Sequence, residues 1–396
     1  MTRAPYLSSR LQGFGTTVFA EMSALAVATG SINLGQGFPD EPGPAEVLDV
    51  ARAAIGTGHD QYPPGPGLPE LRTAIAEHQL RFRGLSYDPD VEVLVTAGAT
   101  EALTAAMLAL LDPGDEVVLF EPMYDCYAAA VAMAGGVPRP VPLRPPPPGD
   151  AGPWTFDEAE LRAAVTPRAR LLLLNTPHNP TGKVFTGAEL ALLAEVATGA
   201  DLLVLTDEVY EHLVFGGAEH VSIATLPGMR QRTLVVSSGG KTFNTTGWKI
   251  GWMCAPAPLV SAVRTAKQFL TYVNGGPFQP AIAAGLRLPD TYFTGIARDL
   301  ERKRDLLVAG LTAAGLPVVS PQATYFATVD VRPVQPDGDG WAFCRSLPER
   351  AGVVGIPTVV FYDPADADLG RHLVRFAFCK TDDVLAEAAQ RLGRMR

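Results

Sequence analysis

Four short stretches of the chain carry the side chains with the clearest potential for chemistry. Gly98-Ala99-Thr100 opens a predicted helix, and Asn179 stands in a Pro-His-Asn-Pro turn. Asp207 ends a very apolar run, and Lys241 follows a Ser-Ser-Gly-Gly turn. Each signal is weak alone, but an anion site, an Asn turn, an acid and then an amine form a specific arrangement.

The helix start and the acid each have a functional and a structural explanation. Free N–H groups and the helix dipole make Gly98-Ala99-Thr100 a candidate anion site, typically for phosphate. The alternative is an ordinary helix start with Thr100 near the cap. A carboxylate at the end of an apolar strand is costly unless it meets a cation or a strong donor. Asp207 therefore either partners a protonated heteroaromatic nitrogen or serves as a helix cap or salt-bridge partner.

Lysine is scarce, which shortens the list of amine nucleophiles. Lysine seldom lies deep in a protein unless it is paired or reactive, and the glycines before Lys241 would let a ligand approach closely. The alternative is a solvated loop lysine. Asn179 belongs to a common type of turn, which is the structural alternative to a functional role. His178 has no partner at a metal-ligand spacing, so we expect no metal site. The six lysines are Lys183, Lys241, Lys249, Lys267, Lys303 and Lys380.

The elements that must position these residues alternate between strand and helix from about residue 91. Strands are predicted at 91–95, 116–120, 171–174, 202–205 and 233–236, and helices at 99–111, 124–134 and 189–197. Near-continuous apolar strands separated by helices indicate a mostly parallel sheet covered on both faces, an α/β fold. In open parallel sheets, ligands bind beyond the carboxyl ends of the strands, which is where the polar stretches lie.

The alternation fades after about residue 285. A long helix at 297–314, alternating strands and a final helix at 382–394 predict a smaller α+β domain. We expect an N-terminal arm with part of the small domain at 1–37, a large domain at 38–288 and the small C-terminal domain at 289–396. The proline run at 144–150 is typical of an extended surface loop.

Composition excludes several classes of protein. Of 396 residues, 47% are hydrophobic, which excludes wholesale disorder. The net charge is −10 with no Lys/Arg-rich run, so we expect no nucleic-acid partner. Four scattered cysteines without a CxxC pair predict neither a disulfide scaffold nor a zinc ribbon. No signal core or membrane-length apolar run is present, so we expect a cytoplasmic protein without a membrane partner.

The combined motifs resemble the pyridoxal-phosphate (PLP) aminotransferases of fold type I, class I/II. The likeness covers nearly the whole chain and is greatest for the subgroup of kynurenine, glutamine and methionine aminotransferases. Its motifs are NLGQGFPD at 33–40, NTPHNPTGKVF at 175–185, TDEVY at 206–210, GKTF at 240–243 with GWKIGW at 247–252, and VRFAF at 374–378. Stretches at 14–25, 277–280 and 378–380 also resemble actinobacterial N-succinyldiaminopimelate aminotransferases.

The resemblance implies PLP as the cofactor. It also implies which residues would contact the PLP ring. Lys241 would bind PLP as a Schiff base and then carry a proton, and a desolvated amine suits both tasks. Asp207 would keep the pyridine nitrogen protonated, so that the ring accepts electrons. Asn179 and Tyr210 would donate hydrogen bonds to the phenolate oxygen. Tyr124 would stack on the ring, with a core aromatic as the alternative.

The resemblance also implies which residues would bind the PLP phosphate and the substrate. Ala99, Thr100, Ser238 and Lys249 would hold the phosphate. Tyr62 would reach the phosphate of a neighbouring subunit, which implies a homodimer; the alternative is a turn tyrosine.

Arg375 would bind the substrate α-carboxylate through its planar fork, helped by Gly35 and Asn179. The alternative is a surface arginine in an edge strand, although the apolar neighbours of Arg375 favour a partly buried head.

The implied activity is ping-pong transfer of an amino group from an L-amino acid to a 2-oxo acid, with N-succinyldiaminopimelate and 2-oxoglutarate as one pair. Aminotransferases of the kynurenine, glutamine or methionine type, and a PLP-dependent carbon–sulfur β-lyase, remain alternatives. No further arginine for a distal carboxylate is identifiable. A PLP-binding regulator would need an N-terminal DNA-binding domain, and the first family motif already begins at residue 33.

Overall fold

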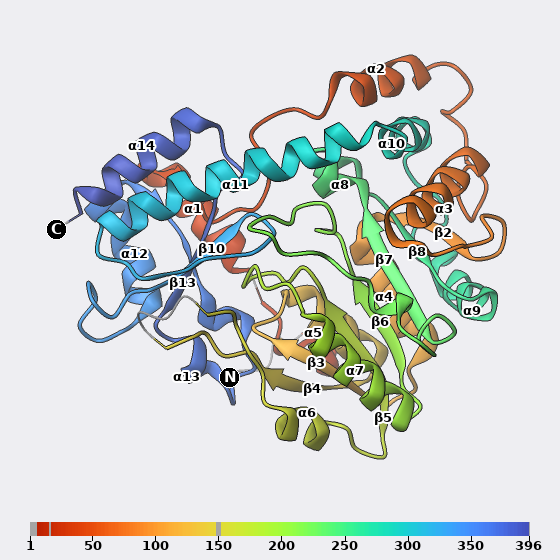
Figure 1. The fold of residues 1–396 in the computed structure, drawn as a ribbon, viewed down its shortest axis with the longest axis horizontal. Helices are drawn as coiled ribbons and strands as arrows, with labels where there is room; N and C mark the ends of the chain where they lie inside the picture. The colour runs from red at the N-terminus through yellow and green to blue at the C-terminus, as the bar shows by residue number, and fades with distance from the viewer. Residues whose placement is uncertain (1–5, 16, 148–151, 396) are drawn as a thin grey trace.

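The computed structural model describes residues 6–15, 17–147 and 152–395. Its centre is a seven-stranded sheet in the order β2-β8-β7-β6-β5-β3-β4, and six of the strands run in one direction while β8 runs against both neighbours (Figure 1). The strands are β2 (Val93–Ala97), β3 (Glu116–Glu121), β4 (Val137–Pro142), β5 (Ala169–Asn175), β6 (Leu203–Asp207), β7 (Thr233–Ser238) and β8 (Ile250–Cys254). The predicted mostly parallel sheet is confirmed.

Helices cover both faces of this sheet. One face packs against α4 (Gly98–Leu110), α5 (Asp125–Ala134) and α9 (Ala257–Lys267). The other packs against α2 (Ala45–Ala54), α3 (Pro69–Arg83) and α10 (Phe278–Leu286) at one end, and α6 (Glu158–Ala164) and α7 (Gly187–Gly199) at the other. Leu171 and Leu173 point into one core, while Leu172 and Leu174 point into the other. The central strands are apolar throughout because both faces are buried.

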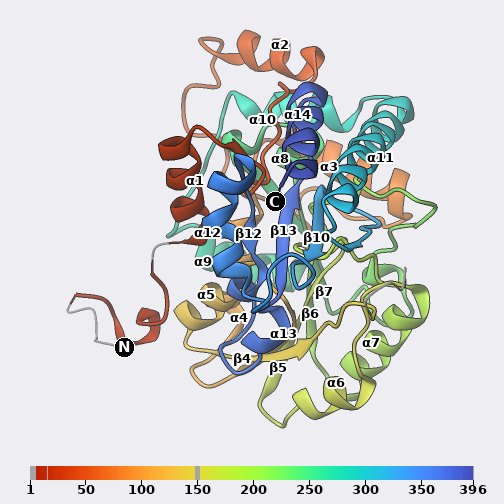
Figure 2. The same cartoon turned by 90° about the vertical axis from the view of Figure 1, so that its left-hand side faces the viewer.

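A second core surrounds a smaller antiparallel sheet (Figure 2). Its order is β12 (Ile356–Pro357), β13 (Leu373–Ala377), β10 (Phe326–Asp330) and β9 (Val318–Val319). The chain's early and late segments meet here, because β1 (Ile32–Asn33) pairs in parallel with β11 (Val353–Val354).

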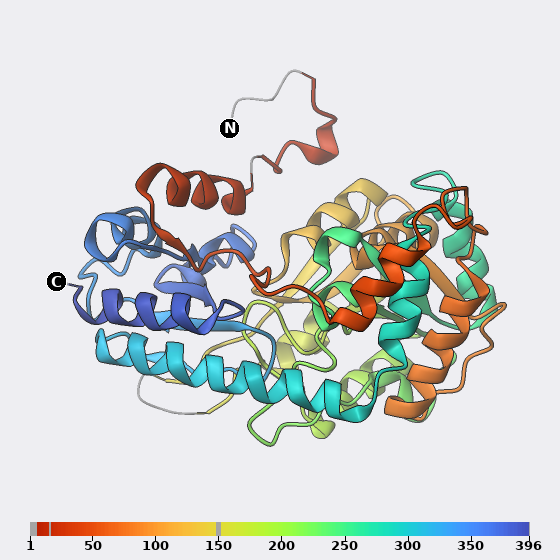
Figure 3. The ribbon, with the colours of Figure 1, turned by 90° about the horizontal axis from the view of Figure 1, so that it is seen from above.

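Helices flank this second sheet. In Figure 3, α11 (Asp290–Ala313) and α14 (Asp382–Gly393) lie side by side, and α1 (Val18–Thr29) lies on the opposite side. The remaining helices are α8 (Gly239–Thr242), α12 (Gly340–Ala351) and α13 (Ala367–Gly370), with 3-10 turns η1 (Ser9–Leu11), η2 (Ile223–Thr225), η3 (Thr246–Trp248) and η4 (Thr358–Phe361). We retain 1–37, 38–288 and 289–396 as a proposed division into domains.

The structure corrects some sequence-based boundaries. The first strand begins at Val93 rather than Val91, whose side chain is half exposed. The long helix begins at Asp290 rather than 297. Of the proline run, residues 148–150 lie outside the described part of the chain, and Arg144 forms a bridge with Thr155. No helix in the described ranges combines the length and the apolar character needed to cross a membrane.

Candidate active site

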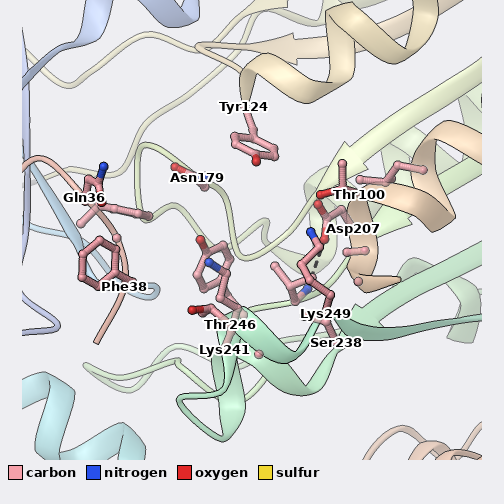
Figure 4. A pocket seen from close by; sticks show the side chains of 18 of the residues that line it. Gln36, Phe38, Thr100, Tyr124, Asn179, Asp207, Ser238, Lys241, Thr246 and Lys249 are labelled. Atoms are coloured by element: carbon pink, nitrogen blue, oxygen red, sulfur yellow. Dashed lines mark hydrogen bonds between the residues drawn. The ribbon is translucent and has the colours of Figure 1, made fainter. Parts of the chain in front are cut away.

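The predicted polar stretches gather around one cavity of about 320 Å³ beyond the carboxyl ends of the large sheet (Figure 4). Its lining comes from the start of α4, the ends of β6 and β7, helix α8, the segment 36–38 and the small sheet. Ten of the residues predicted from the sequence line it: Ala99, Thr100, Tyr124, Asn179, Asp207, Tyr210, Ser238, Lys241, Lys249 and Arg375.

Asp207 is the last residue of β6 and is buried. Its Oδ1 accepts a hydrogen bond from the backbone N–H of Val209 at 3.3 Å, and its Oδ2 accepts one from the Tyr127 hydroxyl at 2.8 Å. Burial raises the pKa of Asp207 to about 6, while the Tyr127 and Val209 hydrogen bonds and the Lys241 amine act in the opposite direction. The carboxylate is therefore held in one orientation at the wall of the cavity.

Asn175, at the end of β5, hydrogen-bonds to the backbone of Asp207 and so helps to fix the position of its carboxylate. Asn175 donates through its amide to the Asp207 carbonyl at 2.9 Å and accepts from the Asn179 backbone N–H at 2.8 Å. One buried side chain thus fixes both the acid-bearing strand and the Asn179 turn.

Lys241 lies in α8, directly after β7. Burial lowers the pKa of its amine to about 8, and the charges of Arg375 and Lys249 act in the same direction. Asp207 opposes that shift. Because a lysine with this pKa is substantially neutral near pH 8, the amine can act as a nucleophile and as a proton acceptor.

The start of α4 forms the anion-binding end of the cavity. Gly98 has a φ of +73°, and a Cβ atom there would lie 3.2 Å from the Lys249 Nζ. A Cβ on Gly251 of β8 would lie 2.6 Å from the Ala99 backbone nitrogen. Only glycine at 251 permits this approach, which places the Lys249 ammonium beside the free N–H groups of the helix.

Arg375 lies on β13, an interior strand of the small sheet, with its side chain buried. The edge-strand alternative is therefore wrong. Its Nη1 donates to the Asn179 Oδ1 at 2.9 Å and its Nη2 to the Gly35 carbonyl at 3.1 Å, while the buried Nε has no hydrogen-bond partner. The guanidinium lies 3.9 Å from the Phe326 ring centroid. Gly35 and Asn179 thus hold Arg375 in place, and an unsatisfied N–H remains for an anion.

Aromatic side chains make much of the remaining wall. Tyr210 packs edge-on against Tyr325 with ring centroids 5.4 Å apart, and the Tyr325 hydroxyl donates to the Gly37 carbonyl at 2.6 Å. The ring centroids of Tyr124 and Tyr127 are 5.7 Å apart at 87°.

Sequence reasoning missed several residues of the lining. They are Phe19, Gln36, Phe38, Tyr127, Val209 and Phe326, among others. Tyr127 lies in the first turn of α5, three positions after Tyr124 at the N-cap, so its spacing could have indicated a shared face. Phe19 and Phe326 come from remote segments, for which no local signal exists.

Tyr62 does not reach this cavity. Its side chain is 83% exposed, and its ring packs edge-on against Tyr272 at 5.8 Å. Tyr62 is not among the residues that line the cavity, and its predicted role concerns a neighbouring subunit.

One cluster among the described residues has donor atoms close enough for a metal ion. It contains His78, Glu211 and His212. The Arg83 guanidinium pairs with Glu211 at 3.2 Å, and the two imidazoles face each other at 2.8 Å between their Nε2 atoms. We assign no ion there, because a dication would adjoin the partly buried guanidinium of Arg83. His178 is also buried, with its Nδ1 2.8 Å from the Thr181 hydroxyl.

The fold and the cavity define a class I/II aminotransferase, and the chain belongs to that family: the profile described as "Aminotransferase class I and II" matches residues 29–392. Among relatives, the chain is 53% identical to the probable N-succinyldiaminopimelate aminotransferase DapC of Mycobacterium tuberculosis, over 97% of each sequence. It is 40% identical to the methionine aminotransferase of Escherichia coli over the full length of both. The solved structure of the Mycobacterium tuberculosis N-succinyldiaminopimelate aminotransferase superposes with a TM-score of 0.93, covering 98% of this chain and 99% of that one.

Members of this family use PLP, and the chain is a PLP-dependent aminotransferase of fold type I. The cavity suits that cofactor. It presents an amine at Lys241, a buried carboxylate at Asp207 and an anion site at the start of α4. The orphaned Nε of Arg375 adds a site for a carboxylate that is separate from the phosphate end.

Proposed function

We propose that this aminotransferase uses N-succinyldiaminopimelate and 2-oxoglutarate as its substrate pair, in a ping-pong cycle. The observation that carries the proposal is the 53% identity with the Mycobacterium tuberculosis enzyme over 97% of both chains. The agreement extends to the overall structure, with a TM-score of 0.93.

We propose a defined task for each site residue. Bound PLP supplies an aldehyde that condenses with amines and a ring that accepts the electron pair released at the substrate Cα. The Lys241 amine holds the cofactor covalently and, once released, moves a proton from the substrate Cα. Asp207 holds a proton on the ring nitrogen, and Arg375 fixes the substrate α-carboxylate.

The phosphate and the phenolate oxygen have their own partners in this proposal. Ala99 and Thr100 offer the N–H groups of α4, while Ser238 and Lys249 complete the anion site. Asn179 and Tyr210 take the phenolate oxygen, and Tyr124 takes the ring face by stacking. The tasks performed by side chains can be tested separately, by removing one side chain at a time.

A second substrate class has one observation in its favour. Apart from Lys241, Lys249 and Arg375, the described residues that line the cavity carry no cation, and Phe19, Phe38 and Phe326 supply apolar surface. That lining suits neutral donors such as methionine or kynurenine. A carbon–sulfur β-lyase would use the same cofactor residues.

Single-turnover spectroscopy separates these substrates. The PLP form is mixed with each amino donor, and the loss of its absorption is followed; the pyridoxamine form is then mixed with each 2-oxo acid. We expect N-succinyldiaminopimelate and glutamate to react with the highest second-order rate constants. A preference for methionine or kynurenine of tenfold or more would reject the pair, and release of pyruvate and ammonia without a 2-oxo acid would indicate the lyase.

We also propose a cytoplasmic homodimer in which Tyr62 completes the neighbouring phosphate site. Tyr62 and Tyr272 pack together while remaining 83% and 50% exposed, and Phe269 nearby is 82% exposed. Exposed aromatic side chains at one place are typical of a protein interface.

Mixed subunits test this dimer. In a hybrid of Lys241→Ala and Tyr62→Phe chains, one site carries both defects and the other carries neither. Activity that rises on mixing supports the shared site, whereas no gain contradicts it. Fractionation of the producing cells tests the location.

A further inference from the structure

We propose that Tyr127 is the positioning residue that sets the acid facing the cofactor ring nitrogen, acting through its hydroxyl on Asp207. The inference rests on the proposed role of Asp207. It assigns a function to a side chain that contacts the carboxylate directly: the Tyr127 hydroxyl donates to the Asp207 Oδ2 at 2.8 Å.

The contact between Tyr127 and Asp207 is enclosed in the core. Its side chain is 2% exposed and packs in the core between the large sheet and helices α4 and α5. Burial and the Asp207 charge raise the pKa of its hydroxyl well above the usual value, so the group stays a donor at all physiological pH values.

Tyr127 also differs from the other donor to Asp207. The Val209 backbone N–H reaches Oδ1 at 3.3 Å and cannot be altered by a side-chain change. The Tyr127 bond is shorter and comes from a different element, so it ties the end of β6 to α5. A hydrogen bond from a neutral donor stabilises the carboxylate over the protonated acid, so it favours the charged form that a ring N–H needs as its partner.

One turn of α5 thus serves two sides of the cofactor. Tyr124 directly precedes the helix, and Tyr127 lies three residues further on, with the two rings in edge-on contact at 5.7 Å. Both residues line the cavity. The helix start therefore couples the ring-stacking surface to the orientation of the acid.

The expected effect follows from the proton balance between Asp207 and the ring nitrogen. Loss of the Tyr127 hydroxyl would raise the pKa of Asp207 above its present value of about 6, so the shared proton would shift about tenfold from the ring nitrogen toward the carboxylate. Several ionisable groups face or adjoin this carboxylate from other positions and remain in place in the variant. They are Lys241, Glu208, Tyr210, Tyr124 and Cys126.

The test compares two cofactors in one protein. Apoenzyme of the full chain is titrated with PLP, and with the PLP analogue in which the ring nitrogen is replaced by C–H; binding is read from protein fluorescence. For Tyr127→Phe we expect the dissociation constant for PLP to rise about tenfold, and that for the analogue to change by less than about twofold. The matched control is Tyr87→Phe, which removes another buried hydroxyl that has no hydrogen-bond partner and lies outside the cavity.

The outcomes are distinct. Equal weakening of both cofactors, or no weakening of either, would overturn the role of Tyr127, because a general loss of packing cannot discriminate between nitrogen and carbon. If the unaltered protein itself binds the analogue as tightly as PLP, the proposed role of Asp207 fails instead. A double variant with Asp207→Asn should show no added effect of Tyr127→Phe on PLP binding, and an additive loss would also overturn the inference.

Discussion

Replacing Arg375 with lysine should damage substrate binding far more than it damages chemistry. Two guanidinium N–H groups of Arg375 are occupied by Asn179 and Gly35, and the buried Nε is without a partner. In the proposed role of Arg375, the substrate carboxylate would therefore meet a fork that is already fixed in direction. A lysine keeps the charge but presents a single point donor without that geometry.

The size of the effect can be worked from the contacts. One charge-assisted hydrogen bond contributes about 1.5–3 kcal/mol, and loss of the guanidinium stacked 3.9 Å from the Phe326 ring adds about 0.5–1 kcal/mol. A total of about 2–4 kcal/mol corresponds to a dissociation constant raised about 30- to 700-fold. Burial lowers the pKa of Arg375 to about 10, and the same burial would lower the pKa of a lysine placed there. The defect of Arg375→Lys should therefore shrink as the pH falls and the lysine becomes charged.

The assay is the half-reaction of the PLP form with an amino donor, followed by stopped-flow absorbance over a range of donor concentrations. We expect the apparent dissociation constant to rise by that factor and the limiting rate constant to fall less than about tenfold. An amine without an α-carboxylate should react equally with both proteins. Arg304→Lys is the matched control, since this arginine stacks 4.9 Å from the Phe215 ring centroid outside the cavity. Donor binding within threefold of the unaltered protein would refute the reasoning.

Four further outcomes are expected. Lys249→Met should weaken PLP about 10- to 100-fold in a fluorescence titration yet leave pyridoxal, which has no phosphate, unchanged; equal losses would contradict the anion site. Gly251→Ala should lower the free energy of unfolding by about 1–3 kcal/mol and weaken PLP binding, because its Cβ would lie 2.4 Å from a backbone carbon at the start of α4. The control Gly247→Ala should do neither, because a Cβ there has no atom within 4 Å. Burial lowers the pKa of Lys241 to about 8, so the rate at which apoenzyme combines with PLP should rise with pH through a midpoint near 8; a midpoint above 10 would indicate an ordinary lysine. Burial raises the pKa of Glu121 to about 8, so the stabilising contribution of its protonated form is present at pH 4 and is lost as the pH rises through 8. Glu121→Gln should therefore raise the free energy of unfolding, measured by urea titration, by about 1–3 kcal/mol at pH 9 but not at pH 5.

The sequence predicted the centre of the fold better than its edge. The apolar runs of β5, β6 and β7 stand out because both faces of these strands are buried. The strand β4 was missed, since its sequence alternates three prolines with other residues and is half exposed. Proline cannot donate to a ladder, and β4 lies at the edge of the sheet, where that donor is not required.

The residues of the candidate site likewise differ in how well the sequence predicts them. Asp207 and Lys241 were predicted because Asp207 ends an apolar strand, Lys241 follows the turn after another, and each belongs to a recognisable motif. The lining contributed by Phe19 and Phe326 depends on how the small sheet meets the large one, which no local pattern encodes. Gly35 was predicted as a substrate contact, whereas the structure shows its carbonyl bonded to Arg375.

The bond between Gly35 and Arg375 joins residues separated by 340 positions. During synthesis on the ribosome, the amine at 241 therefore emerges long before the guanidinium that completes its cavity. The β1–β11 pairing likewise has to wait for residue 353. If Arg375 holds the substrate carboxylate as proposed, a chain stalled before its last strand would lack that contact, and substrate selection would arise only when translation is almost finished.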